Sequence, residues 1–241
     1  MQHRYWMSSH VHACATSRGV IFLDLKRDRY IGLGASDSAL LGRHVEDWPA
    51  FRWEAASEGA GSIEALCATL VADGIISRDA PGLDRLSGAL LDMGAEFVSV
   101  GDEIEVSAPI RTRDVANFLI AYISALCSLR FRPFQKVVES VHRVKRRRAQ
   151  QGVCLPAEIT HVAGLVDRFR RLRACVMTAE GYCLLHALTL VKFLRCYGCY
   201  PEWVIGVAAQ PFGAHAWVQW HHYLLDTNPE KVCRFTPILV V

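Results

Sequence analysis

Residues 181–195 read GYCLLHALTLVKFLR, and three shorter runs follow: PEWVIGV at 201–207, QPFGAHAWVQW at 210–220 and YLLD at 223–226. The first run spaces its apolar residues as a helix does, and we expect that helix to begin at Cys183. The later runs are rich in β-branched and aromatic residues and predict strands, one carrying His215 and the next ending at Asp226. The order predicts a cysteine on a helix, a histidine on a strand and an acid on the next strand.

These residue types, in this order, suit nucleophilic catalysis by a thiol. The first turn of a helix offers unpaired N–H groups and the positive end of the helix dipole, and both favour a thiolate. An imidazole on a neighbouring strand can take the proton, and a carboxylate would hold that ring in the right tautomer. The structural alternative is that Cys183, one of nine cysteines, is a small apolar core residue, and that a backbone group satisfies His215.

The motifs of this region together resemble the transglutaminase-like cysteine protease of lasso peptide biosynthesis, the B protein that removes the leader from the precursor. They are the helix from Cys183 to Arg195 and Gly198, the strand Val204–Val207, the loop Gln210–Phe212, His215–Val218, Pro229 and Thr236–Ile238. The resemblance implies that Cys183 is the nucleophile and His215 the general base.

The acidic residue of this site matches the family pattern less well than the cysteine and the histidine do. The family's Asp usually stands where this chain has Thr227, one position after Asp226. A one-residue step along a strand turns the side chain to the other face. Either a local bulge lets Asp226 reach His215, or Asn228 or a backbone carbonyl orients the ring; we predict Asp226.

Two further motifs of this region are assigned structural roles. His221 and His222 occupy a predicted hairpin turn, where two adjacent imidazoles rarely aim at one metal ion, so we expect an exposed turn and no metal. Cys196 and Cys199 form a C-x-x-C pair at a helix end, without a second pair at zinc-site spacing. No nucleotide-binding glycine loop is recognisable, and we expect no cofactor.

Composition is that of a globular protein. The chain has 241 residues, of which 51% are apolar, and its net charge is +3. This length allows one large domain or two small ones. The odd number of cysteines and a polar start favour reduced thiols and a cytoplasmic protein. Residues 116–129 are apolar but too short to cross a bilayer, and they predict a core helix.

The N-terminal region predicts a small winged-helix domain of about 80 residues. The expected order is a strand at Gly19–Leu25, a return strand at Tyr30–Leu33, a helix capped at Ser36–Ser38 and ending near Leu41, a helix from Ser62 to Asp73, and a short strand at Ile75–Ile76. The second helix carries Glu64 and Asp73 but no basic residue, which disfavours DNA binding.

The run DLKRDRYIGL at 24–33 resembles the RiPP recognition element, a domain related to the PqqD-like peptide chaperone of pyrroloquinoline quinone biosynthesis. The resemblance implies that a leader peptide adds as a strand to the edge of the hairpin sheet, where backbone pairing supplies affinity and side-chain pockets supply specificity. Candidate contacts are Phe22, Tyr30 and Leu66, each of which also suits a plain core position.

Asp79–Gly82 marks the predicted domain boundary. We divide the chain into a leader-recognition domain at 1–80, a linker region at 81–110 and a protease domain at 111–241. Within the linker region, residues 97–100 and 103–106 predict a strand pair. Three helices should follow, at Val115–Leu129 after a cap at Asp114, at Phe134–Gln150 and at Ala157–Arg173. The basic run Arg143–Arg148 is either a solvated helix end or a docking patch for an acidic leader or a partner enzyme.

The resulting prediction is an α+β protein in which a winged-helix, PqqD-like domain precedes a papain-like or transglutaminase-like cysteine protease domain. The resemblance implies a leader peptidase that cuts the leader–core bond of a precursor peptide. It also implies an asparagine-synthetase-like cyclase as the partner that closes the macrolactam with ATP. The alternatives are a transglutaminase that passes the acyl group to an amine and a non-catalytic leader-binding scaffold.

Overall fold

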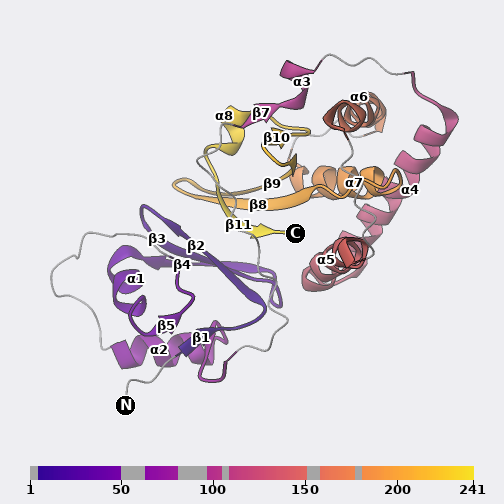
Figure 1. The fold of residues 1–241 in the computed structure, drawn as a ribbon. Coiled ribbons are helices and arrows are strands. Elements are labelled where there is room, and N and C mark those ends of the chain that lie inside the picture. The colour runs from indigo at the N-terminus through magenta and orange to yellow at the C-terminus, as the bar shows by residue number, and fades with distance from the viewer. Residues whose placement is uncertain (1–4, 50–62, 81–96, 105–108, 151–157, 177–180) are drawn as a thin grey trace. The chain divides into compact units, whose positions relative to one another are not determined.

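The computed structural model describes residues 5–49, 63–80, 97–104, 109–150, 158–176 and 181–241 (Figure 1). The chain divides into two compact units. Unit 1 comprises residues 1–88, 207–213 and 236–239, and unit 2 comprises residues 89–206, 214–235 and 240–241. Each unit is considered by itself.

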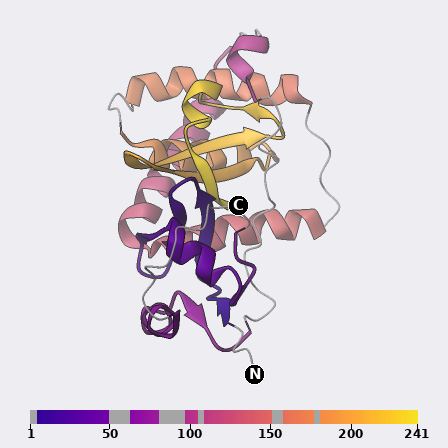
Figure 2. The same cartoon turned by 90° about the vertical axis from the view of Figure 1, so that its left-hand side faces the viewer.

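The described part of unit 1 contains two small sheets and two helices. One sheet is an antiparallel meander in the order β2-β3-β4, and in the other β1 pairs with β5 in parallel and with β6 in antiparallel. Helix α1 lies against β3 and β4 (Figures 1 and 2). The elements are β1 (Tyr5–Met7), β2 (Val11–Thr16), β3 (Gly19–Asp24), β4 (Arg29–Gly34), α1 (Ala35–Leu41), β5 (Val45–Glu46), α2 (Ile63–Ala72) and β6 (Ile76–Ser77).

The predicted hairpin and both predicted helices of this unit are confirmed. The predicted cap of α1 is wrong, because the helix begins at Ala35 after Gly34 and has no side-chain cap. Ser38 is instead buried, where its Oγ accepts the Val20 N–H at 3.0 Å and joins α1 to β3. Ser62, the predicted cap of α2, lies outside the described residues. The sequence also missed β1 and β2, and the winged-helix assignment stays a prediction.

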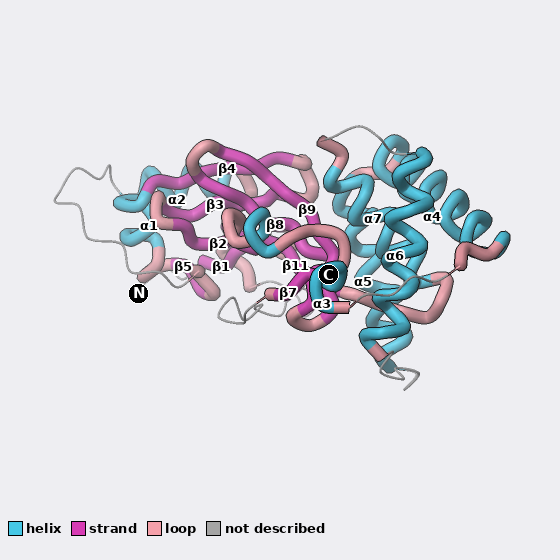
Figure 3. The backbone as a smooth tube through the Cα atoms, turned by 90° about the horizontal axis from the view of Figure 1, so that it is seen from above, coloured by secondary structure: helices cyan, strands magenta, loops and turns pink. Residues whose placement is uncertain are grey.

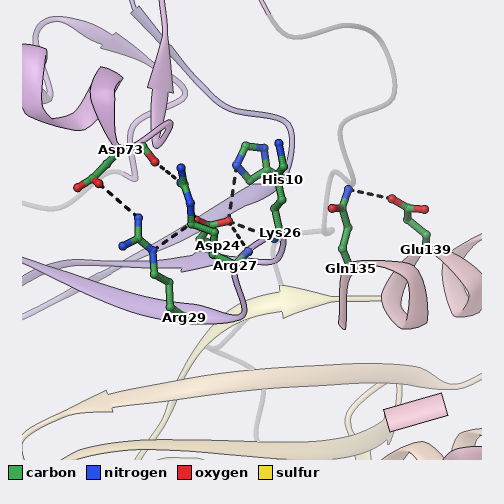
Figure 4. Close-up of polar contacts among 8 residues, drawn as sticks. All are labelled: His10, Asp24, Lys26, Arg27, Arg29, Asp73, Gln135 and Glu139. Carbon is green, nitrogen blue, oxygen red and sulfur yellow. Dashed lines mark hydrogen bonds and ion pairs between the residues drawn. The ribbon is translucent and has the colours of Figure 1, made fainter. Parts of the chain in front are cut away.

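A buried carboxylate ties the β3–β4 turn to the end of α2 (Figure 4). Asp24 is 0% exposed; it accepts the N–H groups of Lys26 at 3.1 Å and Arg27 at 3.2 Å, and it pairs with the Arg27, Arg29 and His10 side chains. Burial acts to raise the pKa of Asp24, but the hydrogen bonds from Arg27 and the nearby charges hold that pKa below its usual value. Arg29 also pairs with Asp73, at 3.5 Å.

Unit 2 combines helices α4 to α7 with a five-stranded sheet in the order β11-β8-β9-β10-β7, of which residues 207–209, 212–213 and 236–239 are counted with unit 1. The strands lie on one side and the helices on the other (Figures 1 and 3). The elements are β7 (Val98–Ser99), α3 (Val100–Glu103), α4 (Thr112–Phe131), α5 (Phe134–Gln150), α6 (Ile159–Val176), α7 (Cys183–Arg195), β8 (Glu202–Ala209), β9 (Phe212–Trp220), β10 (Tyr223–Leu224), α8 (Pro229–Val232) and β11 (Thr236–Val240).

The helices predicted in unit 2 are confirmed, but two other predictions for it are wrong. Residues 100–103 form the short helix α3 instead of a hairpin turn, and β7 pairs in parallel with β10, with Val98 opposite Tyr223. Residues 105–108 lie outside the described residues. Helix α4 is not a buried core helix: it alone among the described helices is long and apolar enough to cross a membrane, and only 28% of its most apolar window is buried.

The Asp24 cluster generates a stability prediction. Replacing Asp24 with Asn removes the negative charge and leaves the cations around it uncompensated. We expect the free energy of unfolding at pH 7 to fall by about 2 to 3 kcal/mol, since the arginines are partly exposed. Urea unfolding measures it. Asp28→Asn, the same change at an exposed position in the same turn, should have little effect, and equal losses would contradict the role of Asp24. Because the Asp24 pKa is lowered in the folded state, its contribution should disappear as the pH falls below about 4.

Candidate active site

Helix α7 places Cys183 at its first residue, as the sequence predicted. The preceding Tyr182 provides no side-chain cap, so the first N–H groups of the helix have no partner within it. The middle and the far end of the helix are buried, with Leu188, Phe193 and Leu194 each 0% exposed. The thiol of Cys183 therefore lies half-buried at the helix start, close to N–H groups that have no partner within the helix.

Strand β9 holds His215 in an aromatic setting. The ring is 8% exposed; its centroid lies 5.3 Å from that of Phe235 and 6.2 Å from that of Trp217. The Nε2 atom is buried and has no hydrogen-bond partner in the described part of the chain. Burial, and secondarily the positive charge of Lys231, lowers the pKa of His215 to about 4. The imidazole is thus neutral at pH 7 and able to accept a proton.

Trp217 fixes the strand next to this histidine, and it needs Gly206 to do so. A Cβ atom at Gly206 would lie 2.6 Å from Cζ3 of the Trp217 ring, which is closer than side chains pack. The indole Nε1 donates to Oε1 of Gln219 at 2.9 Å. Because alternate residues of a strand share a face, His215, Trp217 and Gln219 lie on the same face of β9. The absence of a side chain at Gly206 leaves room for the Trp217 ring to pack against β8.

One cavity of unit 2 brings the predicted residues together. It has a volume of about 720 Å³, and Cys183, His215 and Asp226 all line it. Trp217 and Phe235 supply apolar walls, and further lining side chains are Arg173, His186 and Lys231. The thiol and the imidazole therefore face a common space that is large enough for a peptide segment.

The structure assigns Asp226 contacts other than the predicted one. It lies in a bend two residues after β10 instead of on a strand. Its Oδ1 lies 3.4 Å from Nε of Arg170, and its Oδ2 pairs with Arg173, both on α6. Burial raises the pKa of Asp226, against the attraction of the two arginines. Within the described residues, no hydrogen bond joins Asp226 to His215.

The alternative orienting group, Asn228, is also engaged elsewhere. Its side-chain oxygen accepts the Lys231 N–H at 3.0 Å and caps α8. The group that orients His215 is therefore not fixed by these contacts. Asp226 lines the same cavity as the histidine, and its catalytic role stays a prediction.

The sequence reasoning missed a second histidine in the cavity. His186 follows Cys183 by three residues on α7, a spacing that puts both on one face of a helix, and this spacing was the available signal. Burial, with the positive charges of Arg173 and Lys231, lowers the pKa of His186. The cavity thus has two imidazoles and two cationic side chains around one thiol.

The predicted leader contacts fall in unit 1. Phe22 is 0% exposed in the core, with its ring centroid 5.7 Å from that of Trp48, so it offers a leader no surface. Leu66 is half-buried and packs against the same core. Tyr30 lines an open cavity of about 420 Å³ within unit 1, where its ring meets that of Phe212 at 5.5 Å. Of the three, Tyr30 is best placed for the predicted role.

Comparison with known proteins agrees with this geometry. Residues 125–240 match the family described as the transglutaminase-like superfamily. This part of the chain is a transglutaminase-like domain. Such domains generally belong to cysteine peptidases or acyltransferases, which agrees with a thiol at a helix start and a histidine on a strand that line one cavity. The match covers the end of α4 and every described element from α5 to β11, and therefore the whole cavity. No curated protein and no solved structure matches the chain.

The tight contact at Gly206 predicts a steric effect on the transglutaminase-like domain. Gly206→Ala should force the Trp217 ring to move and destabilise the domain by about 1 to 3 kcal/mol. Thermal or urea unfolding measures it. Gly32→Ala is the matched control on strand β4, because a Cβ atom there meets nothing within 4 Å. A Gly206→Ala protein with unchanged stability would contradict the tight contact between Gly206 and the Trp217 ring.

The environment of His215 predicts its titration. In the folded protein, NMR of the imidazole carbons should show His215 neutral from pH 7 down to about 5 and titrating near pH 4. Unfolding should become easier as the pH falls from 6.5 toward 4, because the unfolded chain takes up this proton first. Lys231→Met should raise the pKa slightly, since burial is the larger cause, whereas Lys136→Met on α5 should not change it. A His215 pKa near 6.5 would contradict the buried geometry.

Proposed function

We propose that the chain is the leader peptidase of lasso peptide maturation, hydrolysing the bond between leader and core of a precursor peptide. The observation that supports this best is that Cys183 and a neutral His215 with an unpartnered Nε2 line one cavity. The resemblance of the surrounding motifs to the lasso protease supplies the substrate class, and the transglutaminase-like match supplies the chemistry.

The chemistry proposed for Cys183 and His215 follows an acyl-enzyme route. His215 takes the thiol proton, and the sulfur attacks the carbonyl carbon of the last leader residue. The unpaired N–H groups at the start of α7 stabilise the oxyanion. The intermediate collapses, the C–N bond breaks, and the imidazolium gives its proton to the leaving amine of the core. Water, deprotonated by His215, then cleaves the thioester and returns the leader as a carboxylic acid.

Asp226 is retained in this proposal as the third member of the site. Arg170 and Arg173 hold its carboxylate at the cavity wall. From there its negative charge offsets the cations around the imidazole when His215 becomes protonated during the reaction. If Asp226 acts in this way, its loss slows the reaction without removing the nucleophile.

Leader recognition is assigned to unit 1. Strand β4 is an edge strand of the β2-β3-β4 sheet, and an edge strand can accept a further strand through backbone pairing. Tyr30 lines the open cavity beside this strand and would give a leader side chain an aromatic contact. The partner proposed for the released core is an asparagine-synthetase-like cyclase, and the proposed location is the cytoplasm.

Acyl transfer to an amine is the second candidate, because the transglutaminase-like match fits it equally well. Both reactions pass through the same thioester at Cys183 and differ in whether water or an amine accepts the acyl group. The products therefore separate them: hydrolysis gives a free leader acid, and transfer gives a crosslinked peptide.

Precursor peptide incubated with the full chain should yield leader acid and free core by mass spectrometry. Cys183→Ala should lower the rate of cleavage at least a thousandfold, because Cys183 supplies the one thiol among the described residues that line the cavity. His215→Ala should have a comparable effect. Cys233→Ala, at an exposed thiol that does not line the cavity, should retain full activity.

Measuring leader binding by itself distinguishes variants that lose catalysis from variants that lose leader recognition. Cys183→Ala should still bind a leader peptide in a fluorescence anisotropy assay, whereas Tyr30→Ala should weaken binding. Cleavage by the Cys183→Ala protein would overturn the peptidase proposal. Leader binding without any cleavage by the wild-type chain would favour the non-catalytic scaffold.

A further inference from the structure

Helix α4 carries an exposed apolar face. Ile123 is 57% exposed and Ile120 is 62% exposed, far more than such residues need be in a packed helix. The other members of this α4 face are Val115, Leu119, Leu126 and, at the helix end, Phe131. Val115, Leu119, Ile123 and Leu126 follow one another at steps of three and four residues and therefore lie on one side of the helix, with Ile120 and Phe131 at the edge of that side. In Figures 1 and 3, α4 is the outermost helix of unit 2.

The opposite face of α4 is fixed to the protein. Phe118, Ala121 and Ala125 are buried there, against α7 and α6. From α7, Lys192 Nζ donates to the hydroxyls of Ser124 and Ser128, each at 2.8 Å. A helix anchored by a lysine ammonium in this way is suited to lie along a surface instead of crossing a bilayer.

The segment of the chain that carries the α4 face is strongly basic. Residues 111–150, which form α4 and α5 with their connection, hold ten Lys and Arg but two Asp and Glu, a net +8 in a chain of net +3. Both acids are engaged: Asp114 is buried and accepts the Tyr197 hydroxyl at 2.5 Å, and Glu139 pairs with Lys136 at 2.9 Å. Exposed arginines stand at both ends of α4 and along the end of α5.

The charge and the apolar side chains of the α4 face indicate which kind of partner it can bind: a second copy of the chain, a nucleic acid or a lipid bilayer. In a two-fold pair of copies packed through antiparallel α4 helices, the Arg111–Arg113 end would meet the Arg130–Arg132 end, and like charges would oppose each other. Nucleic acid would use the arginines, but aliphatic side chains give bases no stacking surface. The interface of an anionic bilayer accepts aliphatic side chains at the acyl boundary and guanidinium groups among the lipid headgroups.

We propose that the α4 face and the basic end of α5 dock the protein on an anionic phospholipid surface. The helix would lie in the plane of the interface, with Ile120 and Ile123 entering the acyl boundary. Docking of this kind leaves the α7 cavity unchanged, and it is independent of the reaction at Cys183.

Vesicle flotation of the full-length protein tests this. Vesicles with one third phosphatidylglycerol should carry the protein at low salt, whereas pure phosphatidylcholine should not, and added salt should release it. Ile120→Gln with Ile123→Gln should weaken binding at least tenfold. These positions are exposed, so the fold, checked by circular dichroism, should persist.

Charge variants give the matched comparison. Arg143→Gln, Arg147→Gln and Arg148→Gln together should weaken vesicle binding at least tenfold. The control is Arg18→Gln, Arg43→Gln and Arg78→Gln, which removes the same charge from exposed positions of unit 1. If both triple variants lost binding equally, net charge alone would explain it and the assigned surface would be wrong.

Two other outcomes would overturn the proposal. Absence of flotation with anionic vesicles at low salt would exclude the lipid surface and leave an acidic protein as the occupant of this face. Dimerisation in light scattering that the Ile120 and Ile123 substitutions abolish, with no binding to vesicles, would assign the face to a second copy of the chain.

Discussion

Burial of α7 determines where the chemistry of this chain can occur. Leu188, Phe193 and Leu194 are completely enclosed and hold the helix against its neighbours, and its first residue, Cys183, lines the cavity. His215 reaches the same cavity from β9, whose position depends on the Trp217 ring passing over Gly206. A helix and a strand thus supply the two groups that line the cavity.

The apolar setting of His215 has a chemical role as well as a structural one. A ring between Phe235 and Trp217 loses solvation, so it stays neutral and its Nε2 remains without a partner. A base that is neutral and unoccupied is ready to accept a proton, but it is also weak, because its pKa is low. A negative group close to the ring would raise this pKa and make the base stronger.

Strong local patterns made much of this fold predictable. The helix at Cys183, the strand at His215 and the hairpin at 19–33 have clear local apolar patterns, and all three are confirmed. The contacts of Asp226 depend on α6, more than 50 residues earlier in the chain, which no local pattern encodes. The same is true of α3, a short helix that stands next to a long-range strand pair where a hairpin was expected. The composition of α4 shows that it is apolar, but only tertiary packing decides how much of it is covered.

The two arginines that hold Asp226 both come from α6, three residues apart, and Arg170 also donates to the backbone oxygen of Leu225 at 2.9 Å. This stretch of the cavity wall is therefore fastened to a single long helix. If α6 moved along its axis, Asp226 and Leu225 would move with it and the shape of the pocket would change.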